Sequence, residues 1–270
     1  TLTHVADVGV ALKSLATADN KPVILTLQTG ETDIAADDVL GKISFQAPDE
    51  GTGTDAILVA AAIQAISEGD FSSSSNATSL EFMTGASEAA TTKFVIASDG
   101  SLSTPTLGTS NVRFGVNAGN SIESGGNYNV CIGDEAGTTL TTGDGNTMVG
   151  YNAGNALDGG YNNVGIGIHA LRDEIEGRGS TAVGVSALQS QSNAGGVDTF
   201  NTAVGYQAGT AVTTGTQNTF IGAGAGGSQN TANASVSIGF EAGASATTSG
   251  GSISIGYKAG NAFTTNGANI

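Results

Sequence analysis

The residues that could carry out acid–base or nucleophilic chemistry are few. The chain of 270 residues contains two histidines, His4 and His169, and one cysteine, Cys131. A Ser-His-Asp or Cys-His set needs partner groups in a fixed arrangement, and the sequence places no such partners beside these three. The neighbours of His169 in a repeated pattern described below are polar, which predicts a solvent-exposed imidazole. Cys131 shares a variable position with Met148 and Phe220 and is predicted to be a buried or interfacial thiol.

Acidic residues form three short clusters, each with two interpretations. A calcium site is one interpretation, because carboxylates are preferred calcium ligands, but no cluster shows an EF-hand loop or the Gly-Gly-x-Gly-x-Asp nonapeptide. Paired carboxylates at Asp49 and Asp55 could cleave a glycosidic bond, although nothing distinguishes them from loop acids. We interpret the clusters as solvated turns and expect no enzymatic activity, no cofactor and no metal. The clusters are Asp37-Asp38, Asp49-Glu50 with Asp55, and Asp173-Glu174-Glu176.

Four aromatic residues occupy the same place in a repeated pattern, each directly after a glycine, and could carry recognition. Each precedes a polar or charged residue, as Tyr206 precedes Gln207. Exposed rings could stack on sugars, whereas packed rings would form a spine between coils or chains. Both interpretations stay open, and the candidate recognition residues are Tyr151, Tyr206, Gln207 and Tyr257. The fourth ring is Phe240.

These residues belong to an internal repeat, which dictates the fold. Residues 201–209 read NTAVGYQAG, and we number the repeat positions 1 to 9 from this stretch. Position 5 is glycine in nine copies, which follow one another at a nearly constant interval of seventeen residues with one clearly longer interval, from Gly184 to Gly205. A tenth copy begins at Asn269-Ile270, so more sequence is expected to follow. The position-5 glycines are Gly115, Gly133, Gly150, Gly167, Gly184, Gly205, Gly222, Gly239 and Gly256.

Each repeat position has its own residue preference. Position 1 is Asn or Ser, position 2 is β-branched and position 4 is apolar, so positions 2 and 4 share one strand face, which we predict to be buried. Position 3 varies and is predicted to lie on a different face. Position 8 is always alanine, as expected where coils or neighbouring chains approach closely. These alanines are Ala118, Ala136, Ala153, Ala170, Ala187, Ala208, Ala225, Ala242 and Ala259.

A stack of β-coils explains the repeat better than helices do. Seventeen residues are too few for two useful helices, and Gly-rich, β-branched segments oppose helix formation. Coils spaced by ~4.8 Å would stack to roughly 43 Å. A coil of this size has a meagre core, so we expect partner chains to supply further burial.

The unit N-T-A-V-G-x-x-A-G is similar to the head repeats of trimeric autotransporter adhesins. The resemblance covers residues 111–270 and implies a parallel β-roll in which three chains pack around one axis. Residues 111–270 are therefore predicted to form a β-roll domain of an intertwined homotrimer, ending within the tenth repeat.

Residues 1–110 are not repetitive and are predicted to form a separate β-domain, with about 1–20 as a connector. Strand-like runs cover 22–30, 38–48, 78–85 and 92–101, and for 54–69 we favour strand over helix. The stretches Leu25-Thr26-Leu27, 38–45, 53–56, 69–72, 80–84 and 94–100 resemble a module of phage tail fibres. That resemblance implies a trimeric β-domain strung along a fibre.

Composition and charge exclude several function classes. The net charge is −16, and both 1–110 (14 acids, 4 bases) and 111–270 (10 acids, 4 bases) are acidic, which disfavours binding to nucleic acid or anionic lipid. No apolar run of ~18 residues exists, so no membrane insertion is expected. A single cysteine excludes an intramolecular disulfide.

The sequence therefore predicts a structural fibre protein of a virion, part of the tail-fibre or host-adhesion apparatus. Its expected partners are two further copies of itself, other virion or tail proteins, and a host surface glycan or protein. A bacterial trimeric surface adhesin, located at the cell surface, is the alternative. A capsule depolymerase and an ice-binding solenoid are weaker alternatives, the latter because position 2 mixes Thr with Val and Ile.

Overall fold

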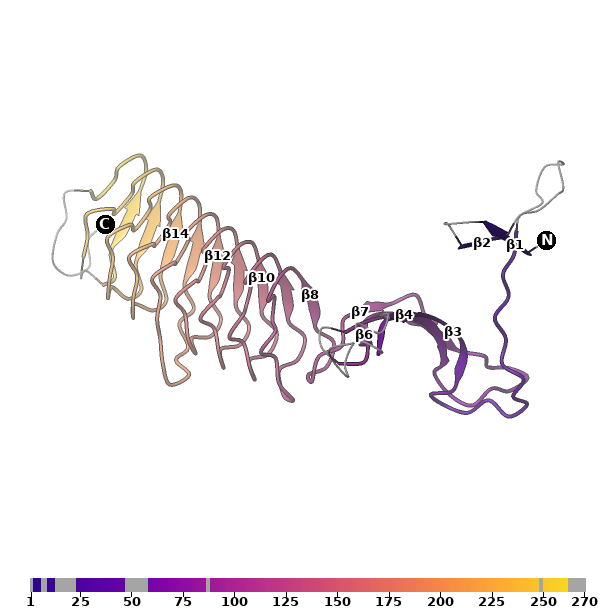
Figure 1. Cartoon of the computed structure of the whole chain (residues 1–270). Helices are drawn as coiled ribbons and strands as arrows, with labels where there is room; N and C mark the ends of the chain where they lie inside the picture. The colour runs from indigo at the N-terminus through magenta and orange to yellow at the C-terminus, as the bar shows by residue number, and fades with distance from the viewer. Residues whose placement is uncertain are drawn as a thin grey trace. The chain divides into compact units, whose positions relative to one another are not determined.

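The computed structural model describes residues 2–5, 9–12, 23–46, 58–85, 88–247 and 250–261. Within these ranges the regular structure is entirely β-strand, with no helix, which confirms the predicted all-β class. The chain divides into two compact units, Thr1–Leu102 and Ser103–Ile270 (Figure 1). The predicted boundary at residue 110 falls inside the second of these units. In the described part of the chain no helix could cross a membrane.

The first unit contains a short antiparallel hairpin and an antiparallel sheet. In the hairpin, β1 (Leu2–Val5) pairs with β2 (Gly9–Leu12), inside the predicted connector. The sheet runs in chain order, and its strands confirm a strand within each of the runs 38–48, 54–69, 78–85 and 92–101, although the strand in the last of these ends at Ile96 and the chain continues as a turn. They are β3 (Val39–Gln46), β4 (Val59–Ser67), β5 (Thr78–Thr84), β6 (Thr91–Ile96) and β7 (Leu102–Ser103).

The strand predicted at 22–30 is wrong. Residues 23–30 are extended but pair with no strand, and one backbone hydrogen bond, from Thr29 N to Leu40 O at 3.1 Å, joins this stretch to β3. Instead of pairing edge to edge, the segment crosses the face of the sheet, where Leu27 lies against Gly41. A Cβ atom on Gly41 would lie 3.0 Å from Leu27 Cβ. The absence of a side chain at Gly41 therefore admits the crossing segment.

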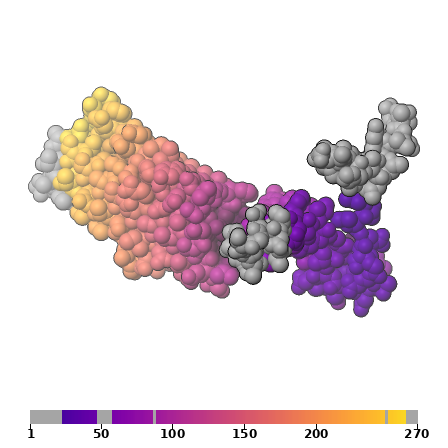
Figure 2. Space-filling view, in the orientation of Figure 1, coloured from indigo at the N-terminus to yellow at the C-terminus, as the bar shows by residue number. Residues whose placement is uncertain are grey.

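The second unit is a parallel β-solenoid, as predicted. Nine three-residue strands pair in parallel and in register, so that each repeat position lies beside the same position of the next coil, for example Thr147 beside Val164. Figure 1 shows this ladder from magenta to yellow, and Figure 2 shows its coils packed into one continuous body. The strands are β8 (Val112–Phe114), β9 (Val130–Ile132), β10 (Thr147–Val149), β11 (Val164–Ile166), β12 (Thr181–Val183), β13 (Thr202–Val204), β14 (Thr219–Ile221), β15 (Val236–Ile238) and β16 (Ile253–Ile255). The predicted start of a tenth copy, at 269–270, lies outside the described residues.

The interior of the solenoid is built on repeat position 3, which corrects the sequence-based assignment of faces. Met148, Ala203 and Phe220 are fully buried, whereas Val204 at position 4 is 38% exposed. Successive side chains of a strand point to opposite faces, so a strand that turns its middle side chain inward turns both flanking ones outward. Positions 2 and 4 therefore face outward, and their constancy reflects the outer surface rather than the core.

In three coils the residue at position 9 compensates for the size of the residue at position 3. Where position 3 is Met148 or Phe220, position 9 is glycine, and a Cβ atom on Gly154 would lie 2.5 Å from the Met148 sulfur. Where position 3 is Gly165, position 9 is Leu171, which is fully buried. In these three coils a large side chain at one position meets glycine at the other, as dense packing of a narrow interior requires.

A ladder of buried asparagines at position 1 ties successive coils together. Asn146 accepts hydrogen bonds from the backbone N–H of Asn163 (3.0 Å) and from its side-chain amide (3.2 Å). The Asn146 amide in turn donates to Asn129 Oδ1 (3.1 Å) and to the Gly160 carbonyl (2.8 Å). Because the same pattern recurs at Asn218, the ladder satisfies buried polar groups that a purely apolar core would leave unpaired.

Candidate functional site

The outer face of the solenoid sheet is the most distinctive surface of the described chain. It consists of repeat positions 2, 4 and 6, and we call it the outer sheet face. Of its 27 positions in nine coils, 22 are apolar, four are threonine at position 2, and one is charged, Asp134. Positions 2 and 4 belong to the strands and position 6 lies in the turn that follows, and from β8 to β16 the face extends over about 38 Å.

In the single chain, eight of the nine position-6 residues and six of the nine position-4 residues are exposed, whereas position 2 is half-buried in eight of the nine coils. At position 4, Phe114 is 51% exposed and Ile221 is 40% exposed, and at position 6, Tyr206 is 57% exposed. Soluble monomers rarely leave a contiguous apolar patch of several hundred Å² in water, and such a patch usually marks an interaction site. The outer sheet face can therefore act as an association surface.

The opposite side of the solenoid differs in character. Positions 10, 11, 13 and 14 carry mainly Thr, Ser, Asn and charged residues, including Asp158 and an ion pair between Arg172 and Asp173 (2.7 Å), with Ile175 as the one large apolar residue among them. Thr139 Oγ1 there donates to the Asn155 carbonyl of the next coil at 2.7 Å. The solenoid is thus amphipathic across its width, with a polar side suited to water and an apolar side suited to burial.

The position-5 glycines allow the coils to stack closely. Their φ angles lie between 125° and 137°, a region that L-residues rarely adopt. In eight of the nine copies a Cβ atom would also lie at most 2.7 Å from the backbone of the position-5 glycine in the next coil. Glycine at this position is therefore required by conformation and by space.

The position-8 alanines lie inside the chain. Eight of the nine are at most 1% exposed, and Ala259, in the last described coil, is half-buried. Each of these alanines closes a tight turn back to its position-5 glycine, as Ala208 N donates to Gly205 O at 3.3 Å. They provide clearance between segments of one coil, whereas a role in contacts between chains has no support in this geometry.

The aromatic residues of position 6 lie on the outer sheet face. Tyr151 is 47% exposed, Tyr206 57% and Tyr257 74%. Phe240 stacks on Tyr257 with centroids 5.6 Å apart, so part of the position-6 column forms contacts between coils. Gln207 at position 7 is exposed and has a left-handed φ of 54°, as the other position-7 residues do.

His169 and Cys131 do not form a reactive centre. His169 is half-buried rather than solvent-exposed, with its ring packed edge-on against Tyr151 (centroids 5.4 Å apart). Cys131 is fully buried at position 3, and burial raises the pKa of its thiol to about 11, against the opposing effect of the Arg113 charge. Burial also lowers the pKa of Arg113, whose Nε donates to the Ala118 carbonyl at 2.6 Å.

The acidic clusters have structural partners where the structure describes them. Glu174 is fully buried and its carboxylate accepts hydrogen bonds from the backbone of Ile175, Gly177 and Asn193 and from the amides of Gln191 and Asn193. Asp38 Oδ2 accepts from Ala35 N at 2.7 Å. Asp49, Glu50 and Asp55 lie outside the described residues. Among the described residues, no group of three or more His, Cys, Asp or Glu is placed to hold a metal ion.

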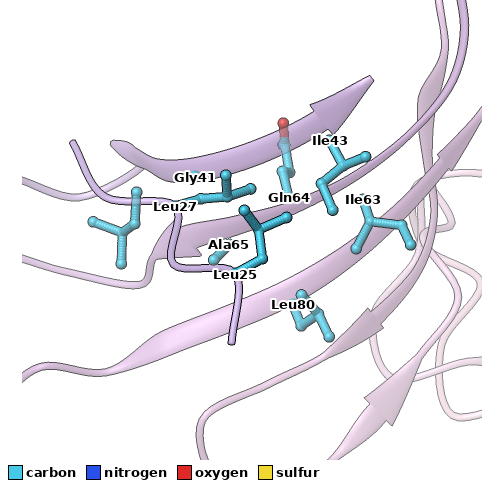
Figure 3. Close-up of a pocket in the computed structure, with 9 residues that line it drawn as sticks. Leu25, Leu27, Gly41, Ile43, Ile63, Gln64, Ala65 and Leu80 are labelled. Atoms are coloured by element: carbon cyan, nitrogen blue, oxygen red, sulfur yellow. The ribbon is translucent and has the colours of Figure 1, made fainter. Parts of the chain in front are cut away.

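The first unit carries an open pocket of about 260 Å³ (Figure 3). Leu25 and Leu27 of the crossing segment border it, together with Ile43, Ile63 and Leu80 of the sheet. Cross-strand register places Ile43 opposite Ile63. The pocket is a gap in an apolar sheet face, and no charged side chain lines it, so it offers no catalytic chemistry.

Comparison with known proteins identifies no relative of this chain. No protein-family model, no curated protein and no solved structure matches it.

Sequence reasoning found the repeat but missed the outer sheet face as a surface. The signal was present, because positions 2, 4 and 6 carry a single charged residue in nine copies. A second feature that sequence reasoning missed surrounds the one long interval of the repeat, where Tyr161, Arg178 and Phe200 lie on successive coils.

Proposed function

We propose that this chain is a structural fibre protein whose solenoids associate, three chains around one axis, through the outer sheet face. The observation that carries the proposal is the contrast between the two sides of the solenoid. One side has a single charge in 27 positions and exposed apolar side chains, and the other is polar. Association would remove the apolar side from water and leave the polar side outward.

The first unit supports the same assembly. Ala62 is the one buried apolar residue among its described residues, whereas Ile43 and Phe45 are 42% and 55% exposed. A sheet of about this size needs an apolar layer against one face to be stable on its own. Neighbouring copies in a fibre would provide that layer.

The proposed role is mechanical. A trimeric rod built from in-register coils would hold a receptor-binding end away from a virion, as part of the tail-fibre or host-adhesion apparatus. The likeness of residues 20–105 to a tail-fibre module supports a virion over a bacterial surface. Other virion or tail proteins and a host surface glycan or protein are the partners that this role requires.

A bacterial trimeric surface adhesin is the second candidate, because the outer sheet face would serve a trimeric head equally well. The ice-binding alternative is less favoured, since Tyr151, Tyr206 and Phe240 interrupt any flat threonine array on the outer sheet face. The depolymerase alternative rests on Asp49 and Asp55, which lie outside the described residues.

Two double variants test the association face. Ile166→Lys with Ile221→Lys places two charges on the outer sheet face, at positions 38% and 40% exposed, so each chain should still fold. The matched control, Thr142→Lys with Thr214→Lys, places the same charges on exposed sites of the polar side. Sedimentation should show single chains for the first variant and trimers for the control. Equal assembly of both variants would contradict the proposal.

A further inference from the structure

The one long coil of the solenoid carries a loop that the other coils lack. Between β12 and β13 the repeat interval is longer than anywhere else, and the extra residues fall within Asn193–Phe200. Figure 1 shows this loop projecting beyond the edge of the neighbouring coils. In repeat architectures, insertions of this kind map to loops on one face, which is often the binding face.

The loop is held by a dense set of hydrogen bonds. Thr199 donates to the Arg178 carbonyl from its backbone N–H (3.0 Å) and from its hydroxyl (2.7 Å), and Arg178 N donates to Val197 O at 3.0 Å. At its start, Asn193 N donates to the buried Glu174 carboxylate at 3.0 Å. A loop fixed in this way loses little conformational entropy when it binds a ligand.

Arg178 is clamped between the loop and the preceding coil. Its guanidinium carbon lies 4.5 Å from the centre of the Tyr161 ring. On the loop side, a Cβ atom on Gly196 would clash with Arg178 Nη2, so the Gly196 backbone lies directly against the guanidinium. Asp198 follows, with a side chain 58% exposed and its carboxylate 4.0 Å from Arg178 Nη1. Arg178 and Tyr161 therefore form a cation–π pair, and the Asp198 carboxylate lies beside it.

Phe200 lies beside this pair and has a left-handed backbone conformation, which glycine and asparagine adopt more easily than phenylalanine does. Its φ is 46°, and the same position holds Asn162 and Gly179 in the two preceding coils, also with positive φ. The Phe200 ring lies over Gly179, where a Cβ atom would approach it to 2.7 Å, yet the side chain is 54% exposed. A bulky residue in the left-handed region is strained. Because the Phe200 side chain is largely exposed, burial within the chain does little to offset this strain.

We propose that the exposed Phe200 ring, beside the Tyr161–Arg178 pair, is a stacking platform for a neutral saccharide, with the Asp198 carboxylate and the Arg178 guanidinium as hydrogen-bonding partners for sugar hydroxyls. Because the Arg178 guanidinium lies on the Tyr161 ring, Phe200 provides the stacking surface and the Tyr161–Arg178 pair forms its border. Apolar ring faces flanked by a few fixed polar groups are typical of ligand sites.

A protein partner fits this platform less well. A stable protein interface buries about 800 Å² on each side, far more than a platform spanning three coils offers. The net charge of −16 disfavours an acidic saccharide. A flat, open site binds each sugar chain weakly, and repetition along a multi-chain fibre would raise the avidity. The site lies within one chain, so it does not depend on the proposed trimer.

Substitution of Phe200 tests the site without disturbing the fold. Phe200→Asn introduces the residue that Asn162 provides at the same repeat position, so the backbone should tolerate it. Tyr128→Asn is the matched control, because Tyr128 occupies this position in another coil, is 66% exposed and also has a positive φ of 57°. Circular dichroism and sedimentation should be unchanged in both variants.

Binding is measured by affinity electrophoresis in native gels that contain dextran, mannan or galactan. The full chain should be retarded in at least one gel, Phe200→Asn should weaken retardation about tenfold, and Tyr128→Asn should not. Absence of retardation in all three gels, or equal retardation of Phe200→Asn, overturns the proposal. A change in assembly mass in Phe200→Asn would instead identify the platform as a contact between chains and would also overturn it.

Discussion

Replacing Asn146 by alanine is expected to lower the free energy of unfolding by about 3 kcal/mol. Asn146 is fully buried, and its side chain makes four hydrogen bonds to the coils on either side. Two of the four partners have a second bond: Asn163 Nδ2 also donates to Gly177 O, and Asn129 Oδ1 also accepts from Asn146 N. The substitution therefore leaves mainly the other two partner groups without a hydrogen bond.

Those two partners are the Asn163 backbone N–H and the Gly160 carbonyl, for which the described residues show no alternative hydrogen bond. Leaving a buried polar group unsatisfied costs about 1–3 kcal/mol. Two such groups together give a loss of about 2–6 kcal/mol, and partial access of water to the cavity left by the amide places the expected value toward the lower end.

Asn146→Ser provides a graded control. Serine occupies the same repeat position at Ser180, where its hydroxyl accepts from Asn201 N at 3.3 Å. Asn146→Ser should therefore keep the bond to Asn163 N–H, lose the bond to Gly160, and cost about half as much as alanine. Urea unfolding at one fixed protein concentration measures both, because assembly makes stability depend on concentration. If serine proved as damaging as alanine, or if neither variant lost stability, the hydrogen-bond accounting would be refuted.

Two further predictions concern the stacking of coils and the buried thiol. Gly205→Ala should lower the free energy of unfolding by about 3 kcal/mol, because the φ of Gly205 is 137° and a Cβ atom would lie 2.7 Å from the next coil. Gly159→Ala is the control and should change the free energy of unfolding little, because a Cβ atom there would lie 3.9 Å from its nearest neighbour. Thermal unfolding measures both variants. The raised pKa of Cys131, about 11, means that the folded state favours the neutral thiol. Stability should therefore be intact below pH 9 and fall as pH rises from about 9 to about 11, where the unfolded chain ionises first. Cys131→Ala, with the residue found at this position in Ala182, should lack that part of the pH dependence, and an unchanged alkaline profile would show that the thiol does not contribute.

The solenoid could be predicted from the sequence because each coil needs the same residue types at the same backbone positions. Glycine at position 5 and asparagine at position 1 recur because φ and the hydrogen-bond ladder demand them, and both survive in most copies. The orientation of the strand could not be read in the same way. Position 3 varies from Gly165 to Phe220 since position 9 adjusts to it, and variation of this kind resembles that of a solvent-exposed site.

Other features depend on contacts distant in sequence. Residues 23–30 alternate like a strand, but the lack of a side chain at Gly41 lets the segment cross the sheet instead of extending it. The platform at Tyr161, Arg178 and Phe200 exists because in-register stacking brings three coils together, and the one long interval of the repeat was the only hint of it in the sequence. The apolar residues of the outer sheet face could be recognised in the sequence as a repeated pattern. Only the structure shows that they lie on the surface of the solenoid and not in its core.

The mass of the native assembly tests the central claim most directly. The chain mass is 26.4 kDa. Sedimentation equilibrium of the wild-type protein at micromolar concentration should give three times this mass if the outer sheet face is buried between three copies. A monomer that remains folded and soluble at 26.4 kDa, with this face open to water, would contradict the account.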